Sequence, residues 1–140
     1  MFQAISHTEI INAPLQEVWE HLLFKIEQPQ HFVPNVSNVI ILEKNKDATL
    51  RKMTVSLPNQ TMTIIEKITA IPYCVKFEII EHPSFSGYVD NNAIALSDNT
   101  TQLIYTMCWI NSLTQTSANN SEILKAAVLK SKHFIEEAIK

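Results

Sequence analysis

The sequence has little of what several common kinds of site require. Gly87 is the one glycine in 140 residues, which excludes a glycine-rich phosphate-binding loop. The five histidines are scattered, and Cys74 and Cys108 do not form a CxxC pair, so the ligand spacings of a metal site are absent. No GxSxG motif marks a nucleophilic serine. These absences predict a protein without a metal or a cofactor.

Long runs of one kind of residue are also lacking. The net charge is -3 and there is no basic run, which excludes the electrostatic footprint of a nucleic-acid-binding protein. No apolar run approaches ~18 residues, so we expect no membrane span. Residues 1–11 lack the charge pattern of a signal peptide. We therefore predict one globular domain over residues 1–140, located in the cytoplasm, and the sequence leaves its oligomeric state open.

The first part of the chain predicts a strand followed by a helix. Residues 2–11 are strand-like, and Asn12 followed by Pro14 is typical of a helix start. Pro29 ends this helix, and residues 28–34 form a compact segment with room for a short second helix. The apolar stripe of the helix contains Leu15, Val18, Trp19, Leu22, Leu23 and Ile26. The opposite face, which we expect in solvent, contains Gln16, Glu17, Glu20, His21 and Lys25.

The rest of the chain predicts a sheet and a covering helix. Six strand-like runs follow, at 36–44, 48–57, 60–71, 74–82, 86–97 and 101–111. Their connections are too short for crossover helices, which predicts an antiparallel meander. An amphipathic C-terminal helix, with Asn119 and Glu122 at capping-box spacing, can cover the apolar face of the sheet. The fold class is therefore α+β, with a curved sheet of about seven strands around one long helix and a cavity between them.

An arginine and a glutamate share the inner face of two neighbouring strands. If Pro58 and Asn59 form a tight turn, residues 57 and 60 are opposite each other, and so are residues 51 and 66. Arg51 and Glu66 would then meet on a surface that is otherwise apolar. Two interpretations are open and compatible. The two residues form a structural ion pair, or they are the polar anchor of a pocket.

Four short segments resemble a known protein superfamily and one of its families. "INAPLQEVWEHL" at residues 11–22 resembles the entry into the first helix of the START and birch-pollen-allergen superfamily (SRPBCC). "KIEQPQHFVPNV" at residues 25–36 resembles the K-x-E-x-P-x-x-F-V-P stretch of its AtaL-like family. "LRKMTV" and "IIEKIT", which contain Arg51 and Glu66, are similar to two strands of that family, although Lys52 and Ile65 depart from its pattern.

The resemblance implies the helix-grip fold and a hydrophobic small molecule held between the sheet and the C-terminal helix. On this basis and on strand alternation, the candidate ligand-binding residues are Arg51, Glu66, Met53, Phe77, Tyr88, Asn92, Tyr105, Met107 and Phe134. The orientation of Asp90 and Asn92 is open, since a bulge near Gly87 would turn them outward. His31 is a further candidate, in a loop that lies near a cavity entrance in this fold, although we favour the interpretation that it is a solvated loop residue.

Three functions are compatible with this sequence. We favour a binding protein for a lipid-like or polyketide-like ligand. The first alternative is a cyclase, dehydratase or hydrolase that uses Glu66 as an acid or base. The second is a protein-interaction module, which would have a filled interior and an exposed apolar patch. Catalytic residues cannot be assigned from the sequence, and the sequence does not name the ligand.

Overall fold

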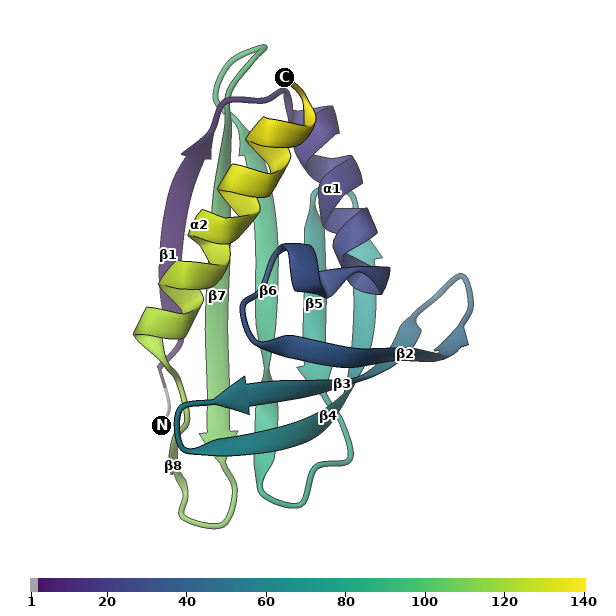
Figure 1. Cartoon of the computed structure of the whole chain (residues 1–140), viewed down its shortest axis with the longest axis vertical. Coiled ribbons are helices and arrows are strands. Elements are labelled where there is room, and N and C mark those ends of the chain that lie inside the picture. Colours follow the sequence, from purple (N-terminus) through teal and green to yellow (C-terminus); the bar gives the residue numbers. More distant parts are fainter. Residues whose placement is uncertain (1–2) are drawn as a thin grey trace.

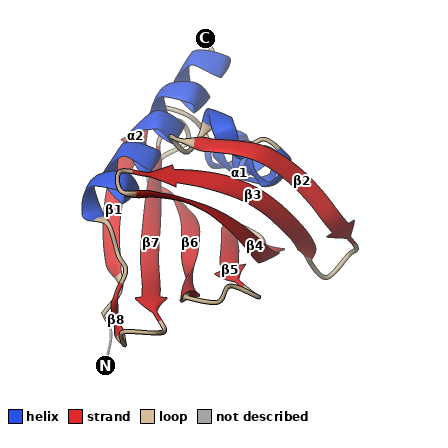
Figure 2. Ribbon diagram, turned by 60° about the horizontal axis from the view of Figure 1, so that its bottom comes forward, coloured by secondary structure: helices blue, strands red, loops and turns tan. Residues whose placement is uncertain are grey.

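The computed structural model describes residues 3–140 and consists of a strongly curved sheet gripping one long helix (Figures 1 and 2). The order is β1 (Ile5–Ile11), α1 (Leu15–Glu27), η1 (Pro29–His31), β2 (Val36–Lys44), β3 (Thr49–Leu57), β4 (Gln60–Ile71), β5 (Cys74–Ile79), β6 (Phe85–Ala95), β7 (Thr101–Asn111), β8 (Thr116–Ser117) and α2 (Ser121–Ala138). The predicted α+β class and helix-grip architecture are confirmed. Gln3 and Ala4, which belong to the predicted strand at 2–11, are not in a strand, and Phe2 lies outside the described residues.

The sheet is an antiparallel meander, as predicted. Its spatial order is β1-β7-β6-β5-β4-β3-β2, and the short β8 pairs with β7. Each strand from β2 to β7 pairs with its sequence neighbour, while β1 closes the other edge against β7. Helix α2 crosses in front of β1 and β7, and α1 lies beside the C-terminal half of α2 (Figure 1).

The turn at Pro58 and Asn59 sets the predicted register between β3 and β4. Leu57 pairs with Gln60, and further along the same ladder Arg51 pairs with Glu66. Alternate residues of both strands are buried on the inner face. A tight turn fixes register because each residue on one strand then has only one possible partner on the other.

The even-numbered residues of β6, including Asn92, face away from the interior. Phe77 of β5 pairs with Val89, and Val75 pairs with Asn91, so the odd-numbered residues of β6 face inward. Asp90 and Asn92 therefore face outward. The pairing of β6 with β5 and β7 is continuous, so a register-shifting bulge is not the cause.

The helix starts differ from the sequence expectation by one or more residues. Helix α1 begins at Leu15 with Pro14 in the cap position and no side-chain cap, and the backbone N–H of Asn12 donates instead to Glu136 (2.8 Å). Helix α2 is capped by Asn120, whose Oδ1 accepts from the N–H of Ile123 (3.0 Å). The predicted cap, Asn119, accepts from the backbone N–H of Trp109 and so joins the end of α2 to β7.

Gly87 allows β6 and β7 to approach closely. Its φ is +114°, a region that favours glycine, and a Cβ at this position would overlap the carbonyl oxygen of Cys108. Five other described residues have positive φ without being glycine: Asn35, Asn38, Tyr73, Glu81 and Gln115.

We predict that Gly87→Ala destabilises the fold by at least about 2 kcal/mol, because the added Cβ meets backbone atoms and the positive φ is strained. Ser86→Ala on the same strand is the control and should cost less than about 1 kcal/mol. Urea unfolding of both variants measures the difference. Equal stability of the two variants would contradict this account of Gly87.

Candidate functional site

A cavity of about 370 Å³ lies between the concave side of the sheet and helix α2. Its wall is largely apolar and comes from β3, β5, β6, β7 and α2, with Met53, Phe77, Val89, Met107, Trp109 and Leu124 as representative lining residues. A volume of this size is typical of small-molecule sites. The sheet curves around α2 (Figure 2), and the residues that line the cavity come from the sheet and from α2.

The two ends of the cavity differ in exposure. Gln60, Thr116 and Ser117 line it and are exposed, which places the mouth between the tip of the β3–β4 hairpin and the start of α2. Lys25, Arg51 and Glu66 line it and are buried. The cavity therefore has an open end and a polar, closed end. His31, which the sequence placed near an entrance, lies away from this mouth and stacks on Phe134 (4.8 Å between ring centres).

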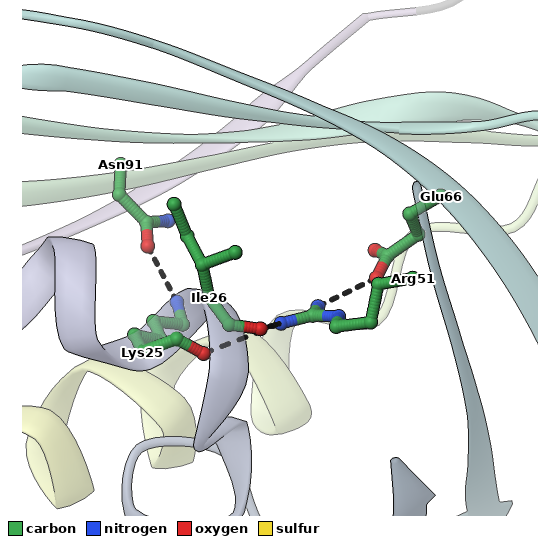
Figure 3. Close-up of polar contacts among 5 residues, drawn as sticks. All are labelled: Lys25, Ile26, Arg51, Glu66 and Asn91. Carbon is green, nitrogen blue, oxygen red and sulfur yellow. Dashed lines mark hydrogen bonds and ion pairs between the residues drawn. The ribbon is translucent and has the colours of Figure 1, made fainter. Parts of the chain in front are cut away.

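Arg51 joins three elements at the closed end (Figure 3). Its Nη2 donates to Glu66 Oε1 on β4 (2.5 Å), and its Nη1 donates to the carbonyl of Ile26 (2.9 Å) and weakly to that of Lys25 (3.3 Å). Both carbonyls belong to the last turn of α1, where helical carbonyl groups lack partners within the helix. The arginine thus neutralises a buried carboxylate and also holds the end of α1 against the sheet.

Lys25 reaches into the same end of the cavity from α1. Its Nζ donates to Asn91 Oδ1 on β6 (2.5 Å), as Figure 3 shows, and lies 4.1 Å from the centre of the Tyr105 ring. The Phe77 ring centre is 4.9 Å away. The side chain is almost fully buried, and the prediction that it faces solvent is wrong.

The charge state of Lys25 follows from these surroundings. Burial lowers the pKa of Lys25 well below its ordinary value, and the neighbouring charge of Arg51 lowers it further. Glu66 acts in the opposite direction. The cavity consequently contains an amine that gives up its proton far more easily than a surface lysine does.

Tyr105 ties the sheet to helix α2. Its hydroxyl donates to Ser131 Oγ (2.5 Å), and Ser131 in turn donates to the carbonyl of Ala127 (2.8 Å). Burial raises the pKa of Tyr105, so its hydroxyl stays protonated over the working range of most proteins. Tyr105 therefore presents a neutral ring to Lys25 and a fixed hydrogen bond to α2.

The structure brings most of the sequence-predicted residues to the cavity. Six of them line it: Arg51, Glu66, Met53, Phe77, Tyr105 and Met107. Tyr88 and Asn92 lie on the outer face of β6, and Lys76 Nζ covers the Tyr88 ring at 4.9 Å. Phe134 packs against Phe32 instead (5.0 Å between ring centres) and does not line the cavity. These three residues correct the sequence-based set.

Two polar residues of the closed end were not found from the sequence. Lys25 is seven residues after Val18 and three after Leu22, which places it on the buried stripe of α1, and this spacing was the available signal. Asn91 is fully buried, but nothing in the sequence shows which face of β6 it occupies.

The cavity residues offer no evident metal set. Among residues 3–140 no group of three or more histidine, cysteine, aspartate or glutamate side chains is placed to hold a metal ion. Neither α1 nor α2, the two α-helices within residues 3–140, has the length and apolarity that a membrane crossing requires.

Comparison with known proteins identifies the family. The family model described as "Acetylaranotin biosynthesis cluster protein L" (AtaL) matches residues 5–140, which confirms the resemblance seen in the sequence. A search of curated protein sequences gives no match.

Solved structures share the fold at low sequence identity. The Zhui aromatase/cyclase from a Streptomyces species has a TM-score of 0.81 at 18% identity, over 100% of this chain and 97% of that chain. Norcoclaurine synthase from Thalictrum flavum, in complex with a transition-state analogue, has a TM-score of 0.77 at 10% identity, over 100% and 98%. A START superfamily protein from Mycobacterium smegmatis has a TM-score of 0.67 at 13% identity, over 97% and 93%.

We predict that the Arg51–Glu66 pair is strongly coupled in stability. Glu66→Leu leaves a buried guanidinium without its carboxylate and should cost about 3–5 kcal/mol of unfolding free energy. Arg51→Met should cost as much, because it also frees the carbonyls of α1. The double variant should cost clearly less than the sum of the two, as measured by urea unfolding. Additive costs would show that the pair is not coupled.

We predict a specific pH dependence for Lys25→Met. Because the pKa of Lys25 is lowered on folding, the unfolded chain holds the proton between the lowered pKa and the ordinary value of about 10.4. The contribution of Lys25 to stability therefore rises with pH across this window. The stability of the wild type relative to Lys25→Met should increase from neutral to alkaline pH in urea titrations. A constant difference would contradict the lowered pKa.

Proposed function

The chain belongs to the AtaL family of the START-like helix-grip superfamily, and from the geometry of its cavity we propose that it binds a hydrophobic or amphipathic small molecule. The observation that carries this proposal is one apolar cavity of about 370 Å³ with a mouth at one end and buried Lys25, Arg51 and Glu66 at the other. Sites that combine an apolar wall with a few convergent polar groups are typical of small-molecule binding.

The ligand lies along β7 in this proposal. Tyr105, Met107 and Trp109 point to the cavity from alternate positions of that strand. Met53 and Met107 supply flexible apolar contacts that adapt to an irregular ligand. Arg51 and Glu66 are the fixed polar reference at the closed end, since they already satisfy each other and the end of α1.

The named relatives support small-molecule chemistry in this fold. One similar structure is an aromatase/cyclase and another is a norcoclaurine synthase holding a transition-state analogue. The family description places its namesake in a biosynthesis cluster. These names favour a natural-product-like ligand for this chain, and fold similarity alone does not identify it.

An enzyme of the same fold is the second candidate. The observation that favours it is Lys25, a buried amine in the cavity whose pKa is lowered toward the range of a general base. The third hypothesis, an interaction module, required a filled interior, and the cavity argues against it. A cytoplasmic location stays a prediction, supported by the free thiols of Cys74 and Cys108.

Filling the cavity should abolish binding. Ala127 is buried and lines the cavity, whereas its neighbour Ala126 is exposed on the same helix. We predict that Ala127→Leu lowers the affinity for the neutral fluorescent dye phenylnaphthylamine at least about tenfold, because it occupies ligand volume. Ala126→Leu should bind as the wild type does. Fluorescence titration measures both, and native mass spectrometry of protein from its host identifies a resident ligand.

Two outcomes would contradict this proposal. If Ala127→Leu binds the dye as well as Ala126→Leu does, the dye does not occupy the cavity. If neither the dye nor a lipid and polyketide panel binds the folded wild type, the cavity does not serve hydrophobic ligands. Thermal unfolding of both variants shows that any loss of binding is not a loss of fold.

A further inference from the structure

The unpartnered polar atoms on the inner side of the sheet are all hydrogen-bond donors. Among residues 3–140, four buried side-chain polar atoms have no partner, and three of them are Arg51 Nε, Asn91 Nδ2 and Trp109 Nε1. The fourth, Asp90 Oδ1, is an acceptor on the outer face of β6. Buried donors without partners are costly and call for an acceptor. Three donors on the inner side of the sheet are therefore left without acceptors.

The closed end also contains one more basic group than acidic groups. The charge of Glu66 is matched by Arg51 at 2.5 Å. In the described part of the chain no carboxylate lies within ion-pair distance of Lys25, whose hydrogen-bond partner is the neutral amide of Asn91. A buried ammonium group is stable only when it is paired. Lys25 therefore either loses its proton or acquires a negative partner.

The polar groups are spread along the cavity. Lys25 lies against the ring of Tyr105, near the closed end, and Trp109 is four residues further along β7. At about 3.3 Å per residue this separation is roughly 13 Å. The wall between them consists of apolar side chains such as Met107 and Val89. This arrangement fits a molecule with a polar head at the closed end and an apolar body that extends toward Trp109.

We propose, building on the small-molecule binding function proposed above, that the ligand is an amphipathic organic acid whose anionic oxygen lies beside Lys25 and Arg51 Nε. A carboxylate supplies the acceptors that these donors lack and the negative charge that Lys25 lacks.

The charges around Lys25 favour this head group over the alternatives. Arg51 on β3 attracts an anion, Glu66 on β4 opposes it, and the two largely cancel because they are paired. Tyr105 on β7 is neutral, so Lys25 determines whether this end of the cavity attracts an anion or a cation. An anion beside Lys25 raises the pKa of Lys25 and keeps it charged. An ammonium head group would instead meet two basic groups and the unpartnered donors of Arg51 and Asn91.

Three ligands with the same tail test this inference. Decanoic acid, decanol and decylamine compete with phenylnaphthylamine for the wild-type protein at neutral pH. We expect the acid to bind at least about tenfold more tightly than the alcohol. The amine should bind most weakly of the three. In Lys25→Met the advantage of the acid over the alcohol should fall below about threefold. Lys130→Met, on the exposed side of α2, should retain the full advantage.

The outcomes distinguish the preference for an acidic head group from small-molecule binding itself. Equal binding of acid and alcohol by the wild type would overturn the acidic head group and leave small-molecule binding intact, provided that Ala127→Leu still blocks the dye. Failure of all three ligands and the dye to bind would overturn the proposed function together with this inference. If Lys25→Met does not fold, the wild-type series of acid, alcohol and amine decides the question alone.

Discussion

The buried guanidinium of Arg51 is the interaction on which this structure depends. It connects neighbouring strands β3 and β4 through Glu66, and it supplies donors to the last turn of α1. Taking two charges out of water costs several kcal/mol per ion, and only good geometry with further hydrogen bonds offsets this cost. Arg51 therefore holds the C-terminal end of α1 at the sheet, and this end of the helix carries Lys25.

The cavity is a consequence of the same arrangement. Because Arg51 holds the end of α1 at the sheet, Lys25 on the last turns of that helix is carried into the interior beside Tyr105. Tyr105 is in turn fixed to α2 through Ser131. The closed end is thus a junction of both helices and the sheet, and its polar groups are positioned by contacts that do not involve a ligand. Such a site is ordered before anything binds.

The predictability of the site from sequence depended on whether a register could be counted. The two-residue turn at Pro58 and Asn59 left one register, so the meeting of Arg51 and Glu66 was found correctly. The link from β5 to β6 spans residues 80–84, whose geometry the sequence does not define, and both faces of β6 are similarly mixed. The sequence therefore leaves the orientation of Asn92 open and gives no sign that Asn91 faces the interior. Lys25 differs from the expectation because lysine is normally exposed, and only its spacing along α1 indicates burial.

The shortage of glycine has a consequence for how the cavity meets its ligand. The left-handed backbone positions of the connecting segments are held by side-chain-bearing residues, among them Gln115 beside the mouth and Asn35 before β2. Such residues have fewer accessible backbone states than glycine, so less conformational entropy is lost when these segments are ordered. Ordering these segments around a ligand therefore consumes less of the binding free energy than ordering glycine-containing segments would. Selection among ligands then depends on fit to an existing volume rather than on adaptation of the protein.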